Sequence, residues 1–229
     1  MMEILAIIPA RGGSKGIPKK NIVSVAGNPL IHFNVKAALN SKYISRLVVS
    51  TDDEKIAGVA RNEGAEVVKR PAEISGDFDS SESALLYTLE LLKDSENYNP
   101  DILVFLQCTS PLTTTEDIDS AISKLINEKA DTALTVAPFH YYLWKENDSG
   151  DLEGINHNKF KRPMRQQREP QYIETGAVYV MRVKKFLKEK YRFFGKIVMS
   201  IMPEERCFEI DEPVDLVLAE QLLKHQQST

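Results

Sequence analysis

The 229-residue chain has little cysteine, no excess of positive charge and no long hydrophobic run. Its two cysteines, Cys108 and Cys207, are too few for a disulfide framework and lack the Cys/His spacing of a metal site, which favours a reducing, cytoplasmic setting. With 29 Lys and Arg against 33 Asp and Glu, the chain has no basic surplus for nucleic-acid binding. Its ordinary globular composition argues against a membrane role, and the short apolar run at residues 4–8 suits a strand better than a signal peptide.

The sequence does contain a regular alternation of apolar runs and amphipathic stretches. Short apolar runs bounded by turn residues predict buried strands of a parallel sheet at Ile4–Ile8, Leu47–Ser50, Val67–Lys69, Ile102–Gln107 and Ala133–Val136. Between these strands, amphipathic patterns predict helices at Leu30–Leu39, Glu54–Glu63, Ser81–Leu92 and Thr115–Glu128. Repeated strand–helix units of this kind predict an α/β fold with three layers and a mostly parallel sheet.

The alternation stops at Pro138, and residues 139–171 are polar, aromatic and basic without a clear period. Such a long excursion within a compact domain is typical of a lid, a binding loop or an oligomer arm. After it, the pattern predicts a strand at Ala177–Met181, a helix at Val183–Tyr191, a strand at Ile197–Met202 and a final helix at Pro213–His225. We therefore expect a single domain over residues 1–229 with an inserted arm.

The loop after the first predicted strand concentrates glycine and positive charge. Residues 10–21 contain three glycines and four cations, namely Arg11, Lys15, Lys19 and Lys20. In open α/β sheets, ligands bind at the carboxyl ends of strands, and glycines there let backbone N–H groups approach phosphate oxygens. The loop matches neither the P-loop nor the dinucleotide-binding pattern, so those two classes are disfavoured. A glycine turn with solvated lysines is the alternative, but the position after a buried strand favours phosphate binding.

A series of short motifs follows along the chain, namely Ala10-Arg11-Gly12-Gly13-Ser14-Lys15, Val49-Ser50-Thr51-Asp52-Asp53, Arg70-Pro71-Ala72-Glu73, Leu106-Gln107-Cys108-Thr109-Ser110-Pro111-Leu112, Arg165-Gln166-Gln167, Thr175-Gly176-Ala177-Val178-Tyr179 and Glu209-Ile210-Asp211. In this order they resemble the motifs of the CMP-N-acylneuraminate synthetases, the cytidylyltransferases that activate sialic acid. The resemblance implies a Rossmann-like nucleotidyltransferase fold and a homodimer. It also implies transfer of CMP from CTP to the C2 hydroxyl of a nine-carbon 2-keto-3-deoxy sugar acid, with Mg²⁺ as cofactor and pyrophosphate as product.

The resemblance also implies which residues bind the nucleotide. They are Ala10, Arg11, Gly13, Ser14, Lys15, Asn21, Arg70, Ser80 and Ser81. Arg11 and Lys20 are expected to be catalytic, because nucleotidyl transfer builds charge on the α-phosphate and on the leaving pyrophosphate. The structural alternative for Arg70 is an ion pair beside a helix. For Ser80 and Ser81 it is helix N-capping, and capping is compatible with a nucleotide contact.

The sugar-acid site is implied in the same way. Its expected residues are Gln107, Thr109, Ser110, Lys145, Arg165, Gln166, Gln167, Thr175, Gly176 and Tyr179. A guanidinium suits a sugar carboxylate, so Arg165 is the leading candidate for that contact. The arm at 139–171 is expected to form the dimer interface and part of this site. Many family members have Asn where Thr175 stands, which leaves the substituent at C5 of the sugar open.

Two carboxylates near the end of the chain are the candidate metal ligands. On an extended strand, Glu209 and Asp211 would lie on one face. Mg²⁺ is commonly held by one or two carboxylates plus substrate phosphates, with Mn²⁺ as an alternative metal here. The family usually has Asp at the first position, so Asp211 is the firmer ligand and is also expected to be catalytic. The alternative is an acidic cluster at the start of the last helix.

Two other functions stay open. One is activation of a different acid, namely legionaminic acid, pseudaminic acid, KDN or the eight-carbon Kdo, although Arg165-Gln166-Gln167 disfavours the last. The other is a catalytically inactive nucleotide-binding homologue, which Glu209 favours and the intact Arg11, Lys20 and Asp211 oppose. No histidine lies in any motif, so the sequence does not identify a general base. Cys108 stands where the family often has proline and is assigned no nucleophilic role.

Overall fold

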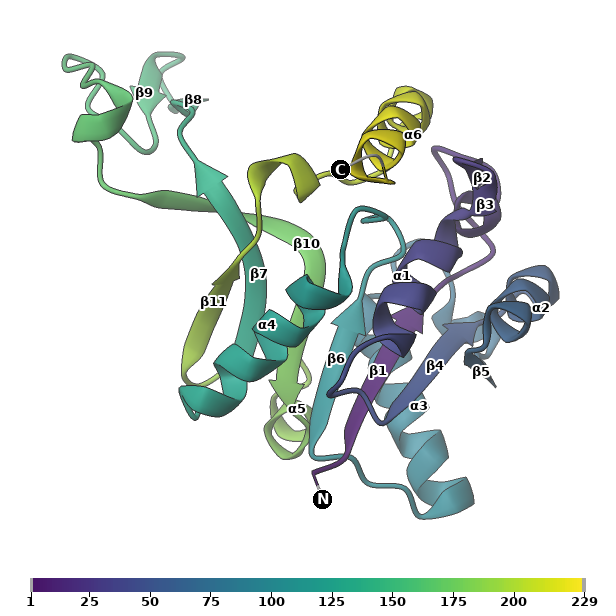
Figure 1. Cartoon of the computed structure of the whole chain (residues 1–229). Coiled ribbons are helices and arrows are strands. Elements are labelled where there is room, and N and C mark those ends of the chain that lie inside the picture. Colours follow the sequence, from purple (N-terminus) through teal and green to yellow (C-terminus); the bar gives the residue numbers. More distant parts are fainter. Residues whose placement is uncertain (1, 228–229) are drawn as a thin grey trace.

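The computed structural model describes residues 2–227, and its centre is a twisted seven-stranded sheet (Figure 1). The strand order is β11-β7-β10-β6-β1-β4-β5. The bounds are β1 (Ile4–Pro9), β4 (Arg46–Thr51), β5 (Glu66–Lys69), β6 (Ile102–Leu106), β7 (Thr132–Phe139), β10 (Gln171–Arg182) and β11 (Ile197–Ile201). β10 runs antiparallel to its neighbours β6 and β7, and the other six strands share one direction. The predicted mostly parallel sheet is therefore confirmed.

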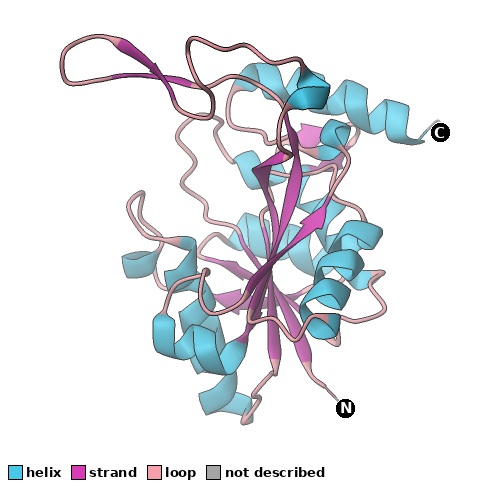
Figure 2. Cartoon of the chain, turned by 90° about the vertical axis from the view of Figure 1, so that its left-hand side faces the viewer, coloured by secondary structure: helices cyan, strands magenta, loops and turns pink. Residues whose placement is uncertain are grey.

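Helices cover both faces of the sheet (Figure 2). On one face, alternate residues of β1 such as Ile4 and Ile8 join a core with the helices α1 (Leu30–Leu39), α2 (Glu54–Glu63) and α4 (Thr115–Asn127). On the other face, Leu5 and Ile7 meet α3 (Ser81–Glu96) and α5 (Val183–Glu189). The central strand β1 is buried on both sides, which is why its sequence is continuously apolar rather than alternating. This arrangement confirms the predicted three-layer α/β sandwich.

The helix boundaries follow local sequence signals. Asp53 caps α2, where its carboxylate accepts the backbone N–H groups of Lys55 and Ile56, and Gly64 ends the same helix at φ 100°. Ser80 caps α3 in the same way by accepting the N–H of Ser83 at 3.2 Å. These caps fix where each helix begins, and therefore where the loops at the carboxyl end of the sheet are held.

The structure differs from the sequence-based expectations in several places. The short hairpin of β2 (Ser24–Val25) and β3 (Asn28–Pro29) was not expected, and β10 begins at Gln171 instead of Ala177. The first residues of β10 are mostly exposed, Tyr172 and Ile173 included, because they leave the body of the sheet and pair only with the outer end of β7. The last helix, α6 (Pro213–Gln227), contributes Ala219 and Leu223 to the core on the α1 face.

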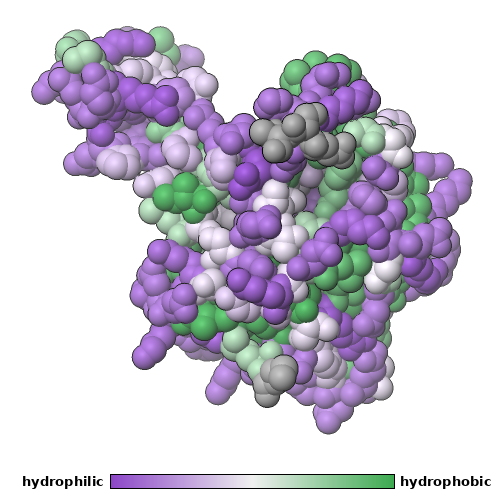
Figure 3. Space-filling model, viewed as in Figure 1, coloured by the Kyte–Doolittle hydropathy of each residue, from purple (hydrophilic) through white to green (hydrophobic). Residues whose placement is uncertain are grey.

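The segment 139–171 projects from the body of the molecule (Figures 1 and 3). Its stem is the outer part of β7 and β10, which pair up to Phe139 and Gln171. The arm itself contains a small hairpin, β8 (Trp144–Glu146) with β9 (Leu152–Gly154), and the 3-10 turn η3 (Arg165–Gln167). It exposes several large apolar side chains, namely Tyr141, Leu143, Trp144, Leu152, Ile155, Phe160 and Met164.

Within residues 2–227, we find no helix with both the length and the apolarity needed to cross a bilayer.

Candidate active site

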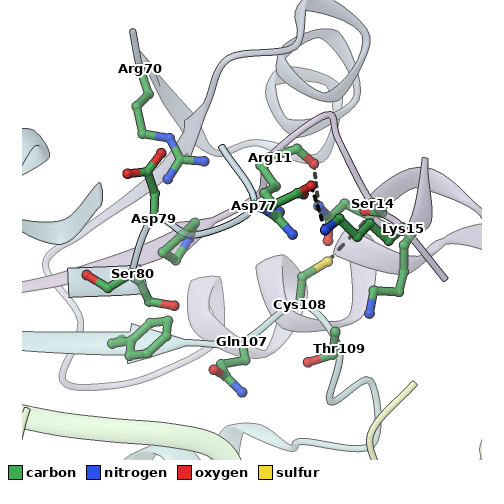
Figure 4. A pocket seen from close by; sticks show the side chains of 15 residues that line it. Arg11, Ser14, Lys15, Arg70, Asp77, Asp79, Ser80, Gln107, Cys108 and Thr109 are labelled. Carbon is green, nitrogen blue, oxygen red and sulfur yellow. Dashed lines mark hydrogen bonds and ion pairs between the residues drawn. The ribbon is translucent and has the colours of Figure 1, made fainter. Parts of the chain in front are cut away.

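A polar cavity of about 300 Å³ opens at the carboxyl ends of β1, β5 and β6 (Figure 4). It lies between the loop after β1, the start of α3 and the residues that follow β6. Its lining residues are Pro9, Arg11, Ser14, Lys15, Lys20, Asn21, Arg70, Asp77, Asp79, Ser80, Ser81, Phe105, Gln107, Cys108 and Thr109. This is the end of an open α/β sheet at which ligands bind.

The loop after β1 is held in place by hydrogen bonds between its backbone and the side chains of Asn21 and Asp52. The side-chain amide of Asn21, which is buried, donates to the carbonyl of Arg11 at 2.9 Å, and the N–H of Gly12 donates to Asp52 at 3.0 Å. At Gly16 a Cβ atom would lie only 2.6 Å from the carbonyl oxygen of Asp211, so a larger residue would force these two segments apart. The loop is thus packed against the segment that carries the candidate metal ligands.

Ala10, Gly13 and Ser14, three of the predicted nucleotide-binding residues, lie in or beside the loop after β1. Ala10 is fully buried and its N–H donates to the carbonyl of Ser50 at 2.9 Å, so only its backbone reaches the loop. Gly13 is exposed, with open space where a Cβ would stand, and Ser14 lines the cavity.

Two cations of this loop are bridged by an acidic residue that sequence reasoning missed. Asp77 lies 3.2 Å from Nη1 of Arg11 and 2.9 Å from Nζ of Lys15, and the same Nη1 atom donates to the carbonyl of Gly76 at 2.6 Å (Figure 4). The two ion pairs hold the pKa of Asp77 below its ordinary value, with the hydrogen bond from Lys15 as the main cause. The only sequence signal was an acidic loop, residues 76–79, placed directly before the helix cap at Ser80.

Arg70 is the most buried cation of the cavity, at 5% exposure. Burial lowers the pKa of its guanidinium, while Asp52 opposes that shift. Within residues 2–227 its buried Nε atom has no hydrogen-bond partner, although the guanidinium lies beside Asp79 (Figure 4). An unpaired buried donor is costly, and Arg70 also lines the cavity, so its guanidinium is a candidate partner for a phosphate or ribose oxygen.

The start of α3 forms a further wall of the cavity. Ser80 caps the helix, as the structural alternative predicted, and both Ser80 and Ser81 also line the cavity. A helix N-terminus directs unsatisfied N–H groups outward and favours negative charge nearby. Ser80 therefore both caps α3 and lines the cavity, and Ser81 lines the cavity beside it.

The candidate metal ligands contact two residues of the cavity wall, Lys20 and Gln107, and lie on an irregular segment and not on a strand. Ile210, which separates them in the sequence, is fully buried, whereas Glu209 and Asp211 are both accessible to solvent. Lys20 contacts Asp211 at 3.0 Å, and the side chain of Gln107 donates to Glu209 at 3.1 Å. Burial and the nearby Asp211 both raise the pKa of Glu209. The segment is held without sheet pairing, by the N–H of Ile210, which donates to the carbonyl of Thr109 at 2.9 Å, and by the contacts of Lys20 and Gln107.

These two carboxylates fit a metal only in part. No group of three or more Asp, Glu, His or Cys that could hold an ion is found within residues 2–227. Two hard oxygen donors next to a phosphate-binding loop nevertheless match the way in which Mg²⁺ is held, with one or two carboxylates and the remaining ligands from substrate phosphates and water.

The predicted sugar-acid residues are spread over three environments. Gln107 and Thr109 line the cavity, and Gly176, at φ 67°, lies so close to Glu209 that a Cβ would overlap its carboxylate. Ser110 lies beneath the cavity, fully buried, where its carbonyl accepts the amide of Asn34.

Two of the sugar-acid residues on β10 point elsewhere. The hydroxyl of Thr175 is buried and donates to the carbonyl of Thr135 at 3.1 Å, so it faces the core. The ring of Tyr179 stacks on Phe105, with the centroids 5.3 Å apart, and its hydroxyl donates to Glu174.

The arm residues do not line this cavity in the same chain. Lys145 lies on β8, 3.6 Å from Glu153, and Arg165 lies on η3, 4.0 Å from Glu204. Arg165 is 65% exposed, and the neighbouring Gln166 and Gln167 are exposed as well. The structure thus brings the nucleotide residues together and leaves the arm residues apart from them.

A cationic cavity at the carboxyl ends of parallel strands places the chain among α/β proteins that bind phosphorylated ligands. Comparison with known proteins narrows this class. The family model described as cytidylyltransferase matches residues 5–227, and the chain belongs to that family.

Three relatives with known activities show how far the similarity extends. The pseudaminic acid cytidylyltransferase of Campylobacter jejuni (strain 81-176) is 32% identical over 97% of both chains. N-acylneuraminate cytidylyltransferase A of Danio rerio is 34% identical over 96% of this chain, and the Escherichia coli O18:K1:H7 enzyme of that name is 30% identical over 95% of it. The chain spans about half the length of these two N-acylneuraminate enzymes, 50% and 51% respectively.

Solved structures confirm the nucleotidyltransferase fold. A CMP:2-keto-3-deoxy-manno-octonic acid synthetase complexed with CTP aligns with a TM-score of 0.73 at 16% identity, covering 98% of this chain and 99% of that one. A 4-diphosphocytidyl-2C-methyl-D-erythritol synthase from Anaerococcus prevotii aligns with a TM-score of 0.70 at 13% identity, covering 97% and 99%.

Proposed function

We propose that the chain transfers CMP from CTP to the C2 hydroxyl of a nonulosonic acid and releases pyrophosphate. The observation that carries this proposal is the cavity at the carboxyl ends of β1, β5 and β6, where Arg11, Lys15, Lys20 and the unpaired Nε of Arg70 gather in a mildly acidic protein. Membership of the cytidylyltransferase family supports CTP as the nucleotide.

The cavity suits an in-line attack of the sugar hydroxyl on the α-phosphorus of CTP. Negative charge then grows on the α-phosphate and on the leaving pyrophosphate. Arg11 and Lys20 stabilise that charge, because fixed cations act strongly in a site from which water is partly excluded. Ser14, Lys15 and Asn21 complete the phosphate cradle, and Arg70 with Ser80 and Ser81 holds the nucleoside side.

Glu209 and Asp211 are the residues that would hold Mg²⁺ or Mn²⁺. Such an ion would supply positive charge that offsets the negative charge of the triphosphate and of the leaving pyrophosphate. Lys20 holds Asp211 in position at 3.0 Å, and Gln107 does the same for Glu209 at 3.1 Å. The side chain of Asp211 is 70% exposed and therefore accessible to an incoming ligand.

The sugar acid requires a cation for its carboxylate, and we assign that contact to the arm. Arg165 is exposed and lies away from the cavity of its own chain, so the arm of a second copy would supply it. The apolar side chains that the arm exposes are those that a homodimer would cover. Gln107, Thr109 and Gly176 would line the sugar side from within the chain that binds the nucleotide.

Two acids are the leading substrates. An N-acylneuraminic acid is favoured by the motifs and by the 34% identity to the Danio rerio enzyme. Pseudaminic acid is the second candidate, because the Campylobacter jejuni relative matches this chain from end to end, at 97% coverage of both.

A pyrophosphate-release assay tests the function and names the acid. Purified protein is incubated with CTP, Mg²⁺ and, in turn, N-acetylneuraminic, pseudaminic, legionaminic, KDN and Kdo acids. We expect release with one nine-carbon acid, none with Kdo, and loss of release on chelation of the metal. Absence of release with every acid would contradict the proposal.

A further inference from the structure

Arg192 forms a buried ion pair that no step of the proposed reaction uses. It lies in the turn between α5 and β11, where its Nε and Nη2 atoms donate to the two carboxylate oxygens of Glu82 at 2.7 and 3.2 Å. The two side chains are only 17% and 8% exposed. Burial opposes ionisation of both groups, yet the pairing outweighs it, since the pKa of Glu82 lies below its ordinary value and that of Arg192 above.

The same guanidinium lies against two aromatic rings. It is 5.0 Å from the ring centroid of Phe105 on β6 and 4.6 Å from that of Tyr179 on β10. The two rings stack on each other with an interplanar angle of 18°. One arginine therefore contacts α3, β6 and β10 at once, through a bidentate ion pair and two cation–π contacts.

These contacts connect two walls of the nucleotide cavity. Glu82 follows directly after Ser80 and Ser81, which line the cavity at the start of α3. Phe105 lines it from β6. Arg192 itself is not a lining residue, so its effect on a nucleotide must pass through these neighbours.

A buried ion pair adds little stability, because well-packed apolar residues can replace it at no cost. The planar guanidinium of Arg192 does fix geometry, because two of its N–H groups can donate to one carboxylate in only a single orientation. We infer that Arg192 is a positioning residue that holds the first turn of α3 at the distance from β6 required for CTP binding. This inference rests on the proposed function.

Arg46 provides a matched control. It donates to both oxygens of Glu66 at 3.0 and 2.6 Å, it lies 4.8 Å from the ring centroid of Tyr98, and its side chain is 16% exposed. It begins β4 and so lies at the opposite end of the sheet from the cavity. Both arginines hold a carboxylate through two N–H groups and lie against an aromatic ring, but at opposite ends of the sheet. Arg46 also pairs with Glu96 at 2.7 Å, and its two carboxylate partners are more exposed than Glu82, at 55% and 48%.

The test compares Arg192→Met, Arg192→Lys, the double variant Glu82→Leu/Arg192→Met, and Arg46→Met. The dissociation constant of CTP is measured by titration calorimetry, and thermal unfolding is followed in parallel. We expect Arg192→Met to weaken CTP binding by about tenfold or more, since small displacements of binding groups have large effects. Arg192→Lys keeps the charge without the fork and should recover part of this loss.

The double variant separates positioning from stability. It leaves no unpaired buried charge, so it should regain the melting temperature lost in Arg192→Met without regaining CTP affinity. Arg46→Met should lower the melting temperature and leave CTP binding unchanged. If the double variant binds CTP as tightly as the wild type, or if Arg46→Met weakens binding equally, Arg192 is not a positioning residue.

The measurement also distinguishes this inference from the proposed function. CTP binding requires neither the acid substrate nor turnover. A wild-type protein that does not bind CTP overturns the proposed function and the inference together, whereas a wild type that binds CTP with unaffected variants overturns the inference alone.

Discussion

The nucleotide cavity and the arm are built in opposite ways. In the cavity, Lys20 is only 17% exposed and is fixed by Asp211 and the carbonyl of Ile210, both at 3.0 Å. On the arm, Arg165 is 65% exposed, and its nearest acidic partner, Glu204, is 4.0 Å away. The difference supports the proposal that one chain preorganises the nucleotide side of the site, while the exposed cations of the arm serve the acid side only when a second copy approaches.

The largest expected effect is on the cavity side, from Asp211→Ala. Removing this carboxylate takes away a proposed metal ligand and the partner of Lys20. We expect the turnover number to fall by about 100-fold or more, as for other losses of transition-state electrostatics. The control is Glu212→Ala, an exposed carboxylate on the next residue. Unchanged turnover in Asp211→Ala would show that the site assignment is wrong.

A smaller effect is expected on the arm side, from Arg165→Ala. Loss of a charge-assisted hydrogen bond of about 1.5–3 kcal/mol should raise the KM for the acid roughly 10- to 100-fold. The KM for CTP should not change, because Arg165 lies outside the nucleotide cavity. Steady-state kinetics with each substrate varied in turn measure the two KM values. Lys161→Ala, which removes another exposed cation of the arm, is the control. Equal changes in both KM values would contradict separate roles for cavity and arm.

The smallest effect concerns Asp77, whose carboxylate competes with phosphate for Arg11 and Lys15. Asp77→Asn removes the competing charge, so CTP should bind up to about fivefold more tightly, as expected for partly exposed ion pairs. The gain should shrink at high salt because the ion pairs are screened. Titration calorimetry at two salt concentrations measures it, with the exposed Glu73→Gln as control. Weaker binding in Asp77→Asn would mean that Asp77 assists the nucleotide.

The sequence predicts the parts of this molecule that depend on local pattern. The strands, the helices and the cationic loop at 10–21 follow from hydrophobic period and glycine content, and the structure confirms the fold. The pairs of Asp77 with Arg11 and of Arg192 with Glu82 join residues 66 and 110 positions apart, so no local pattern indicates them. The contacts of Lys20 with Asp211 and of Gln107 with Glu209 also join distant parts of the chain, so the spacing of the two carboxylates does not indicate what holds them.

The central claim, that the cavity of one chain works with the arm of another, is tested most directly by complementation. Asp211→Ala has an intact arm, and Arg165→Ala has an intact cavity. An equal mixture that exchanges subunits contains half mixed dimers, each with one complete site. At an acid concentration near the wild-type KM, where the Arg165→Ala protein alone turns over slowly, the account predicts recovery of pyrophosphate release to about a quarter of the wild-type rate. Proven subunit exchange, with a rate no higher than the sum of the two parents, would contradict it.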